Sequence, residues 1–178
     1  MQDWLMRNPK SERALSRVRV IFFDVDGVFT DGKTWQDQTG QWRRAFSVRD
    51  TMGVRAIRKA GFRVIVLTPA ASPEIRTHFD LIGVDVFRDQ CLDSRAVVDQ
   101  VLAAEGYSLD QAVFVAETAS GEIEIRLNGI AIYKTSRQGG DGAVLEICSL
   151  MLQQNASQQM SDPVSLIRTT IRTTVGEP

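Results

Sequence analysis

Short apolar runs alternate with segments of helical periodicity along the centre of the chain. Each apolar run predicts a buried strand, and each segment between two runs predicts a helix. A series of strands and helices in alternation is typical of an α/β fold, with a mainly parallel sheet and helices on both faces. The predicted strands are Val18–Phe23, Val64–Leu67, Val84–Phe87, Ala112–Val115 and Gly129–Tyr133.

Capping residues and glycines predict where the helices begin and end. Asp50 is expected to cap a helix over Thr51–Ala60, which Gly61 ends. A second helix begins with Ser72-Pro73-Glu74 and runs to Ile82, where Gly83 stops it. Further helices are expected from Asp93 or Ser94 to Gly106, from Ser120 or Gly121 onward, and over Ala143–Leu152.

The segment between the first strand and the first helix predicts a β-hairpin at about residues 33–46. Lys33–Gln36 and Trp42–Phe46 flank Asp37–Gly40, which has the polar, glycine-containing composition of a turn. Because its tryptophans are expected to be exposed, we expect the hairpin either to cover the mouth of an active site or to pair its edge with a partner subunit. The alternative is a surface loop without a role.

Length and composition fit one globular domain with polar ends, since 178 residues with 43% hydrophobic content are enough for a full core. We expect an N-terminal extension over 1–17, a domain over 18–152 and a flexible tail over 153–178. A net charge of -1 gives no basic field for nucleic acid, and no apolar run approaches a membrane span. We therefore expect a cytoplasmic protein without nucleic-acid or membrane partners, with Cys91 and Cys148 as reduced structural thiols.

Two acidic residues follow the first predicted strand, in Asp24-Val25-Asp26-Gly27-Val28-Phe29-Thr30-Asp31-Gly32. They lie at the carboxyl end of a buried strand, where open α/β sheets place their ligands. Gly27 permits close backbone approach, so the carboxylates of Asp24 and Asp26 can converge on a hard cation and a phosphate. The alternative is that the two aspartates only cap a turn.

This stretch resembles the first motif of the haloacid dehalogenase-like phosphatases, in the capless branch that contains 3-deoxy-manno-octulosonate 8-phosphate phosphatase. Three further features follow in the same order: the hairpin in place of a cap domain, Phe46–Asp50, and Gly139–Val144. The resemblance covers residues 11 to 152. It implies a Rossmann-like fold, Mg²⁺ as cofactor, a small phosphorylated sugar acid as substrate, and a homotetramer assembled through the hairpin.

The resemblance also implies roles for the acidic residues. Asp24 is expected to be the nucleophile that forms an aspartyl-phosphate, and Asp26 the acid/base that protonates the leaving alkoxide and then activates water. The metal ligands would be Asp24, the main-chain carbonyl of Asp26, and Glu117. Gly27 would lie beside the substrate.

Phe46–Asp50 is implied to lie near the substrate mouth. Arg49 could there hold a sugar-acid carboxylate, with Asp50 beside it. The family normally has glycine at the position of Thr51, and the alternative for Asp50 is an ordinary helix N-cap.

The second and third motifs depart from the family pattern. Thr68 matches a hydroxyl that binds a phosphoryl oxygen, but Pro69 and Ala70 replace the usual glycine and arginine, and the alternative is a strand-end cap. Ser94 stands where the family has a lysine. Arg95 would substitute for that lysine only with its guanidinium turned inward, since one residue rotates a helical side chain by about 100°. The alternative is a solvated surface arginine.

The fourth motif, normally G-D-D-x-x-D, is replaced by Ala116-Glu117-Thr118-Ala119-Ser120-Gly121. Glu117 takes the place of the metal-binding aspartate, and the other two acids are absent. Two hypotheses follow from these departures. The first is a magnesium-dependent phosphomonoesterase of low activity, and the second is a catalytically impaired homologue that acts in binding or assembly.

Overall fold

The computed structural model, which describes residues 15–117, 127 and 129–161, is built on a five-stranded sheet. Its strands run in the order β5-β4-β1-β6-β7, and every neighbouring pair is parallel. All five predicted strands are confirmed, and with them the α/β fold. The strands are β1 (Val20–Phe23), β4 (Arg63–Leu67), β5 (Val86–Arg88), β6 (Ala112–Ala116) and β7 (Ala131–Lys134).

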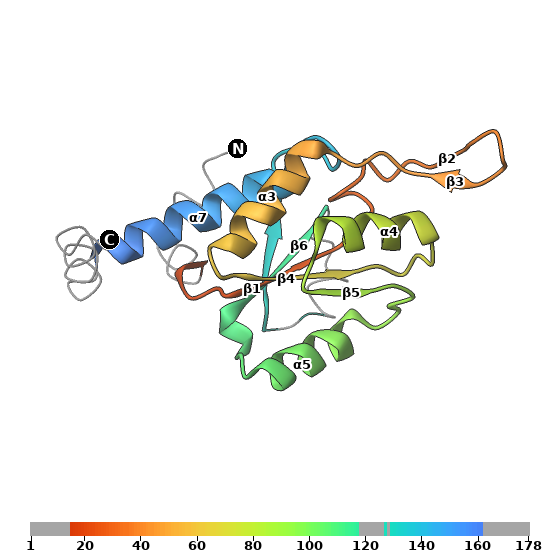
Figure 1. Ribbon diagram of the computed structural model, residues 1–178. Helices are drawn as coiled ribbons and strands as arrows, with labels where there is room; N and C mark the ends of the chain where they lie inside the picture. Colours follow the sequence, from red (N-terminus) through yellow and green to blue (C-terminus); the bar gives the residue numbers. More distant parts are fainter. Residues whose placement is uncertain (1–14, 118–126, 128, 162–178) are drawn as a thin grey trace, which may run out of the picture.

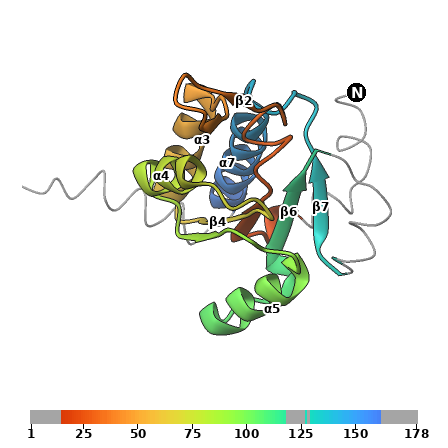
Figure 2. The ribbon, with the colours of Figure 1, turned by 90° about the vertical axis from the view of Figure 1, so that its right-hand side faces the viewer.

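Helices cover both faces of the sheet, as predicted. Figures 1 and 2 show α3, α4 and α7 on one face and α5 on the other. The predicted glycine stops are confirmed: Gly83 ends α4 and Gly106 ends α5, each in a left-handed conformation that glycine adopts without strain. The helices are α3 (Val48–Lys59), α4 (Pro73–Ile82), α5 (Ser94–Glu105), the 3₁₀ helix η1 (Leu109–Gln111) and α7 (Ala143–Ser161).

The central strand β1 is packed on both sides. Ile21 and Phe23 join the core under α3, α4 and α7, whereas Val20 and Phe22 join the core under α5. All four side chains are fully buried, which explains why β1 is an unbroken apolar run in the sequence. Phe29 extends the first core, with its ring edge-on to Phe23 at 5.4 Å. This packing holds the start of the loop after β1 in place against the core.

The sheet order makes the end of β1 the topological switch point of the sheet. From β1 the chain leads first to β4 on one side, and later to β6 and β7 on the other. Ligands of open α/β sheets bind at the carboxyl edge near such a point. Asp24 lies there, and its main-chain N–H donates to the carbonyl of Val115 on β6 at 3.1 Å.

The structure corrects the predicted start of the first helix. Ser47 is the N-cap of α3, so Asp50 lies inside the first turn. Its buried carboxylate instead accepts a hydrogen bond of 2.9 Å from the main-chain N–H of Leu145, at the start of α7. The first N–H groups of a helix lack partners within it and attract a negative charge. Asp50 therefore caps α7 and not the helix in which it lies, α3.

The last helix extends beyond its predicted end at Leu152, since α7 continues to Ser161. No glycine or proline interrupts residues 153–161, and glutamine is a good helix former. The predicted boundary between residues 152 and 153 thus falls inside a helix. None of the described helices is both long enough and apolar enough to cross a membrane.

Several predictions fall on residues outside the described part of the chain. These are residues 1–14 of the predicted extension, the short helix expected at Ser120 or Gly121, Thr118 of the fourth motif, and the predicted tail from 162 onward. Leu15, at the edge of the described region, is buried in the core.

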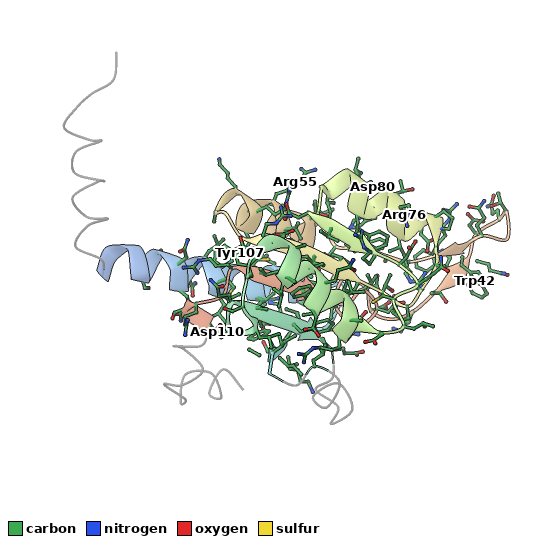
Figure 3. All side chains as sticks on the ribbon, turned by 90° about the horizontal axis from the view of Figure 1, so that it is seen from below. Trp42, Arg55, Arg76, Asp80, Tyr107 and Asp110 are labelled. Carbon is green, nitrogen blue, oxygen red and sulfur yellow. The ribbon has the colours of Figure 1, made fainter. Side chains whose placement is uncertain are left out.

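The predicted hairpin is confirmed. β2 (Trp35–Gln36) pairs antiparallel with β3 (Trp42–Arg43), and the ribbon projects from the body of the molecule, with no cap domain among the described residues (Figure 1). Figure 3 shows Trp42 on this projection. Trp35 lies opposite Arg43 and Trp42 opposite Gln36, so the two tryptophans point to opposite faces of the ribbon. Both indoles are about half exposed, at 48% and 56%.

Candidate active site

Asp24 begins the loop after β1 and is partly buried at the carboxyl edge of the sheet. Burial raises its pKa to about 6; a hydrogen bond from the Val25 N–H opposes this rise, and the nearby charges of Asp26 and Glu117 add to it. No cation pairs with Asp24 within the described part of the chain. Among the residues that the structure describes, this carboxylate is therefore a negative group without a paired cation, at the place where α/β sheets bind ligands.

A tight turn brings the rest of the aspartate loop, residues 24–32, back onto itself. The Val25 carbonyl accepts hydrogen bonds from the N–H groups of Val28, Phe29 and Thr30, at 3.2, 2.8 and 3.2 Å. The Thr30 hydroxyl then reaches the Asp26 carboxylate, 2.8 Å from Oδ1. The turn thus fixes the Asp26 side chain relative to the main chain around it.

The glycine-rich segment before α7 supports the aspartate loop from outside. A Cβ atom on Gly139 would lie 2.3 Å from the carbonyl oxygens of both Gly27 and Thr30, so the two backbones are in direct contact. The Gly140 N–H also donates to the Val28 carbonyl, at 3.3 Å. The start of α7 is itself held by the hydrogen bond from the Leu145 N–H to Asp50. The glycine-rich segment and the first turn of α7 therefore support the aspartate loop together.

Glu117 follows β6 and lies over Gly27. A Cβ atom on Gly27 would be only 2.3 Å from Glu117 Oε2, and its φ of +84° also favours glycine. Glu117 is also close enough to Asp24 to raise the pKa of that carboxyl. The structure thus brings together three residues that the sequence predicted for the site: Asp24, Gly27 and Glu117.

These residues fit a magnesium ion with a small protein ligand set. No cluster of three or more acidic, histidine or cysteine side chains arranged to hold a metal occurs among the described residues. Magnesium, however, prefers hard oxygen ligands and commonly takes one or two carboxylates while keeping several waters. Asp24 and Glu117 supply two such carboxylates. Burial raises the pKa of Asp24 most, and a cation beside the two carboxylates would offset the charge repulsion that adds to this rise.

Asp26 is engaged by an arginine that the sequence reasoning did not single out. Arg44 donates from Nε to Oδ1 at 2.8 Å and from Nη2 to Oδ2 at 3.0 Å. Its remaining nitrogen, Nη1, donates to Glu74 Oε1 on α4 at 3.0 Å. These bonds raise the pKa of Arg44, above all the hydrogen bonds to Asp26, so the guanidinium remains charged. Of the predicted pair of aspartates, only Asp24 is without a cationic partner among the described residues.

Comparisons with known proteins agree with this architecture, although no protein-family model matches the chain. The 3-deoxy-D-manno-octulosonate 8-phosphate phosphatase of Haemophilus influenzae is 24% identical over 165 residues, 85% of this chain and 92% of that protein. The Escherichia coli K12 protein of the same name is 28% identical over 149 residues, 76% of this chain and 79% of that protein. This chain is therefore similar to haloacid dehalogenase-like phosphatases.

A solved structure supports the same similarity for the fold of this chain. The crystal structure of the Moraxella catarrhalis 3-deoxy-D-manno-octulosonate 8-phosphate phosphatase, in complex with magnesium, phosphate and KDO, matches it with a TM-score of 0.73. The match covers 82% of this chain and 91% of that structure, at 21% identity. The Rossmann-like fold without a cap domain is thereby confirmed.

Residues of the predicted second and third motifs make hydrogen bonds to neighbouring residues in the structure. Thr68 directly follows β4, and its buried hydroxyl accepts a hydrogen bond from the Ala70 N–H at 3.2 Å, as in the strand-end cap considered above. Arg95 donates from Nε to both carboxylate oxygens of Asp99, at 2.9 and 2.8 Å. Asp99 lies one helical turn further along α5, so this pairing is that of a surface arginine.

The two residues predicted to lie at the substrate mouth have different environments in the structure. Arg49 is 65% exposed and lies 3.7 Å from Asp141, a weak pairing that leaves its guanidinium accessible. Asp50 is 1% exposed, and burial raises its pKa against the main-chain amides of α7 that lower it. The predicted substrate contact of Asp50 is therefore replaced by a structural one, because its carboxylate points into the contact between α3 and α7.

Proposed function

We propose that this protein is a magnesium-dependent phosphomonoester hydrolase of low activity that acts on a small phosphorylated sugar acid. One observation carries the proposal: at the end of the central strand, Asp24 has a raised pKa and lies near Glu117, and none of the described residues pairs a cation with it. The relatives named 3-deoxy-D-manno-octulosonate 8-phosphate phosphatase support the choice of substrate class.

In this proposal, Asp24 attacks the phosphorus atom and forms an aspartyl-phosphate, while Asp26 exchanges a proton with the leaving oxygen and then with water. Asp24, Glu117 and the main-chain carbonyl of Asp26 would hold Mg²⁺. When bound, this ion supplies positive charge that offsets the repulsion between the carboxylate and the phosphate. Without the lysine of the family pattern, less positive charge stabilises the transition state, which is why we expect low activity.

Two more residues belong to the proposed substrate site. Thr68 offers a hydroxyl to a phosphoryl oxygen, and the exposed Arg49 offers a guanidinium to the carboxylate of a sugar acid. Arg95 and Asp50 are left out, because Arg95 pairs with Asp99 and Asp50 is buried against α7.

The proposal predicts phosphate release that depends on a divalent ion. With magnesium, we expect one or a few compounds in a panel of sugar-acid phosphates to be hydrolysed faster than neutral sugar phosphates. Excess chelator should reduce the rate to the uncatalysed level, since Asp24 and phosphate would then repel each other. The measurement is inorganic phosphate released over time. Equal rates with magnesium and with chelator would contradict the proposal.

A second candidate function is a catalytically impaired homologue that binds a ligand or a partner. The observation in its favour is the pairing of Asp26 with Arg44, which occupies both carboxylate oxygens of the proposed acid/base. This candidate predicts that phosphorylated sugar acids bind, as measured by calorimetry, but that no phosphate is released from any of them.

We also propose that the protein works in the cytoplasm as a homotetramer assembled through the hairpin. Cys91 and Cys148 are both free thiols buried in the fold, as expected in a reducing compartment. The hairpin projects from the body with two half-exposed indoles, and such apolar surface commonly marks a contact with another subunit.

Trp42→Ser is predicted to lower the number of subunits, because it removes the most exposed aromatic side chain of the hairpin. Sedimentation velocity measures this directly. The matched control is Leu81→Ser, which removes an apolar side chain that is 77% exposed on α4 and should leave the assembly unchanged. An unchanged subunit number for Trp42→Ser would exclude that role of the hairpin.

A further inference from the structure

Arg44 joins the hairpin to the aspartate loop and to α4. Its side chain is only 11% exposed, and its guanidinium donates two hydrogen bonds to Asp26 and one to Glu74. Glu74 is held in turn by the Ser72 hydroxyl at the start of α4. A planar guanidinium that bridges two carboxylates in this way is fixed in direction as well as in position.

The same hydrogen bonds restrict the orientation of the Asp26 carboxylate. Oδ2 accepts from Arg44, and Oδ1 accepts from both Arg44 and the Thr30 hydroxyl. General acid–base catalysis requires a carboxyl oxygen within hydrogen-bond reach of the reacting oxygen. These three hydrogen bonds fix the direction of the Asp26 carboxylate, so it turns toward a leaving group only by weakening its contact with Arg44.

The need for that contact depends on the leaving group. When Asp24 bonds to phosphorus, the phosphorus–oxygen bond of the ester breaks and its electron pair stays on the departing oxygen. An aryloxide carries this pair as a stable anion, whereas an alkoxide has to take up a proton as it leaves. Water then attacks the aspartyl-phosphate, which restores the Asp24 carboxylate and releases phosphate. The proton that this water loses goes to Asp26 if Asp26 has protonated an alkoxide, and to solvent if an aryloxide has left without a proton.

We propose that Arg44 determines leaving-group specificity, acting as a positioning residue that restrains Asp26 and so weakens its proton transfer to the departing oxygen. The protein then hydrolyses aryl phosphates, whose leaving groups depart without a proton, much faster than alkyl phosphates such as sugar phosphates. This inference rests on the proposed phosphomonoesterase function. It also supplies a physical reason for low activity toward sugar-acid phosphates.

Arg44→Gln tests the inference through a ratio of two rates. The ratio compares kcat/KM for p-nitrophenyl phosphate with kcat/KM for β-glycerophosphate, because kcat/KM reports the step in which the ester bond breaks. A proton donor in contact with the leaving group contributes about 10²–10⁴-fold. We therefore expect Arg44→Gln to raise kcat/KM for the alkyl ester and to lower the ratio at least about 10-fold.

Arg43→Gln is the matched control. Arg43 precedes Arg44 in the chain, but its guanidinium pairs with Asp37 in the hairpin turn, so its removal should leave the ratio unchanged. Arg44→Lys is a second variant that retains a positive charge within the fold. A lysine ammonium cannot reproduce the bidentate contact, so this variant should also lower the ratio, by less than Arg44→Gln does.

The outcomes separate this inference from the proposed function. If hydrolysis depends on Asp24 but the ratio is the same in wild type, Arg44→Gln and Arg44→Lys, Arg44 has no such role and the phosphatase proposal stands. If neither wild type nor the Arg44 variants hydrolyse either ester in an Asp24-dependent way, both are overturned. A fall in the ratio that Arg43→Gln does not share supports the inference.

Discussion

Asp24→Asn is expected to abolish magnesium-dependent phosphate release, with a loss on the order of 10³-fold or more. An amide is a poor nucleophile toward phosphorus, and it also removes a negative ligand from the proposed metal site. Initial rates of phosphate release measure the effect. The matched control is Asp31→Asn in the same loop: Asp31 pairs with Lys33 at the surface, and its loss should change the rate little. Similar rates for wild type and Asp24→Asn would exclude Asp24 as the nucleophile.

The same substitution should make the protein more stable above pH 6 in the presence of a chelator. The carboxyl of Asp24 has a pKa of about 6 in the folded state, against 3.8 without the fold, so the folded state holds its proton to higher pH. Stability of the wild type is therefore lost as pH rises from about 4 to about 6. Asparagine has no such loss, so we expect a gain of about 1–3 kcal/mol at pH 8 and none at pH 4.

Urea denaturation at the two pH values measures this difference. A gain of the same size at pH 4 and pH 8 would show that ionisation of Asp24 is not its cause. If Asp24→Asn is more stable but inactive, the charge of Asp24 destabilises the fold and is required for catalysis.

Gly139→Ala is expected to impair both stability and activity. The new Cβ atom would lie 2.3 Å from two carbonyl oxygens, and both belong to backbone that cannot rotate away as a flexible side chain could. Forced separation of two packed segments costs about 1–3 kcal/mol. The displaced aspartate loop carries Asp26, and a shift of about 1 Å in reacting groups lowers rates by about 10²-fold.

Urea denaturation and kcat/KM for p-nitrophenyl phosphate measure the two effects of Gly139→Ala. Gly40→Ala in the hairpin turn is the control, since nothing lies within 4 Å of its Cβ position. Its φ of +77° makes alanine cost about 1–2 kcal/mol, but activity should be retained. If both variants keep the same activity, contact between Gly139 and the aspartate loop does not support catalysis.

The elements of this fold could be predicted where the signal is local. β1 and β4 are short apolar runs because both of their faces are buried, and α4 lies between a proline and a glycine that fix its bounds. The first motif likewise lies within one loop, residues 24–32, so it is recognised without knowledge of distant contacts. Periodicity and capping preferences were therefore sufficient for the sheet, most helices and the position of Asp24.

The remaining features depend on contacts between distant parts of the chain. Ser47 and Asp50 are both good N-cap residues, and the choice between them is made by Leu145, which meets Asp50 only in the folded state. Arg44 looks like one more basic residue of an exposed hairpin, yet it reaches back to Asp26. No local pattern distinguishes it from Arg43, whose guanidinium stays in the turn.

The opposite orientation of Trp35 and Trp42 on the ribbon has a consequence for assembly geometry. With one indole on each side, the arm is able to touch two neighbouring copies at once. An arm that contacts two copies joins more than two subunits, and the assembly is closed when the contacts follow a rotational symmetry.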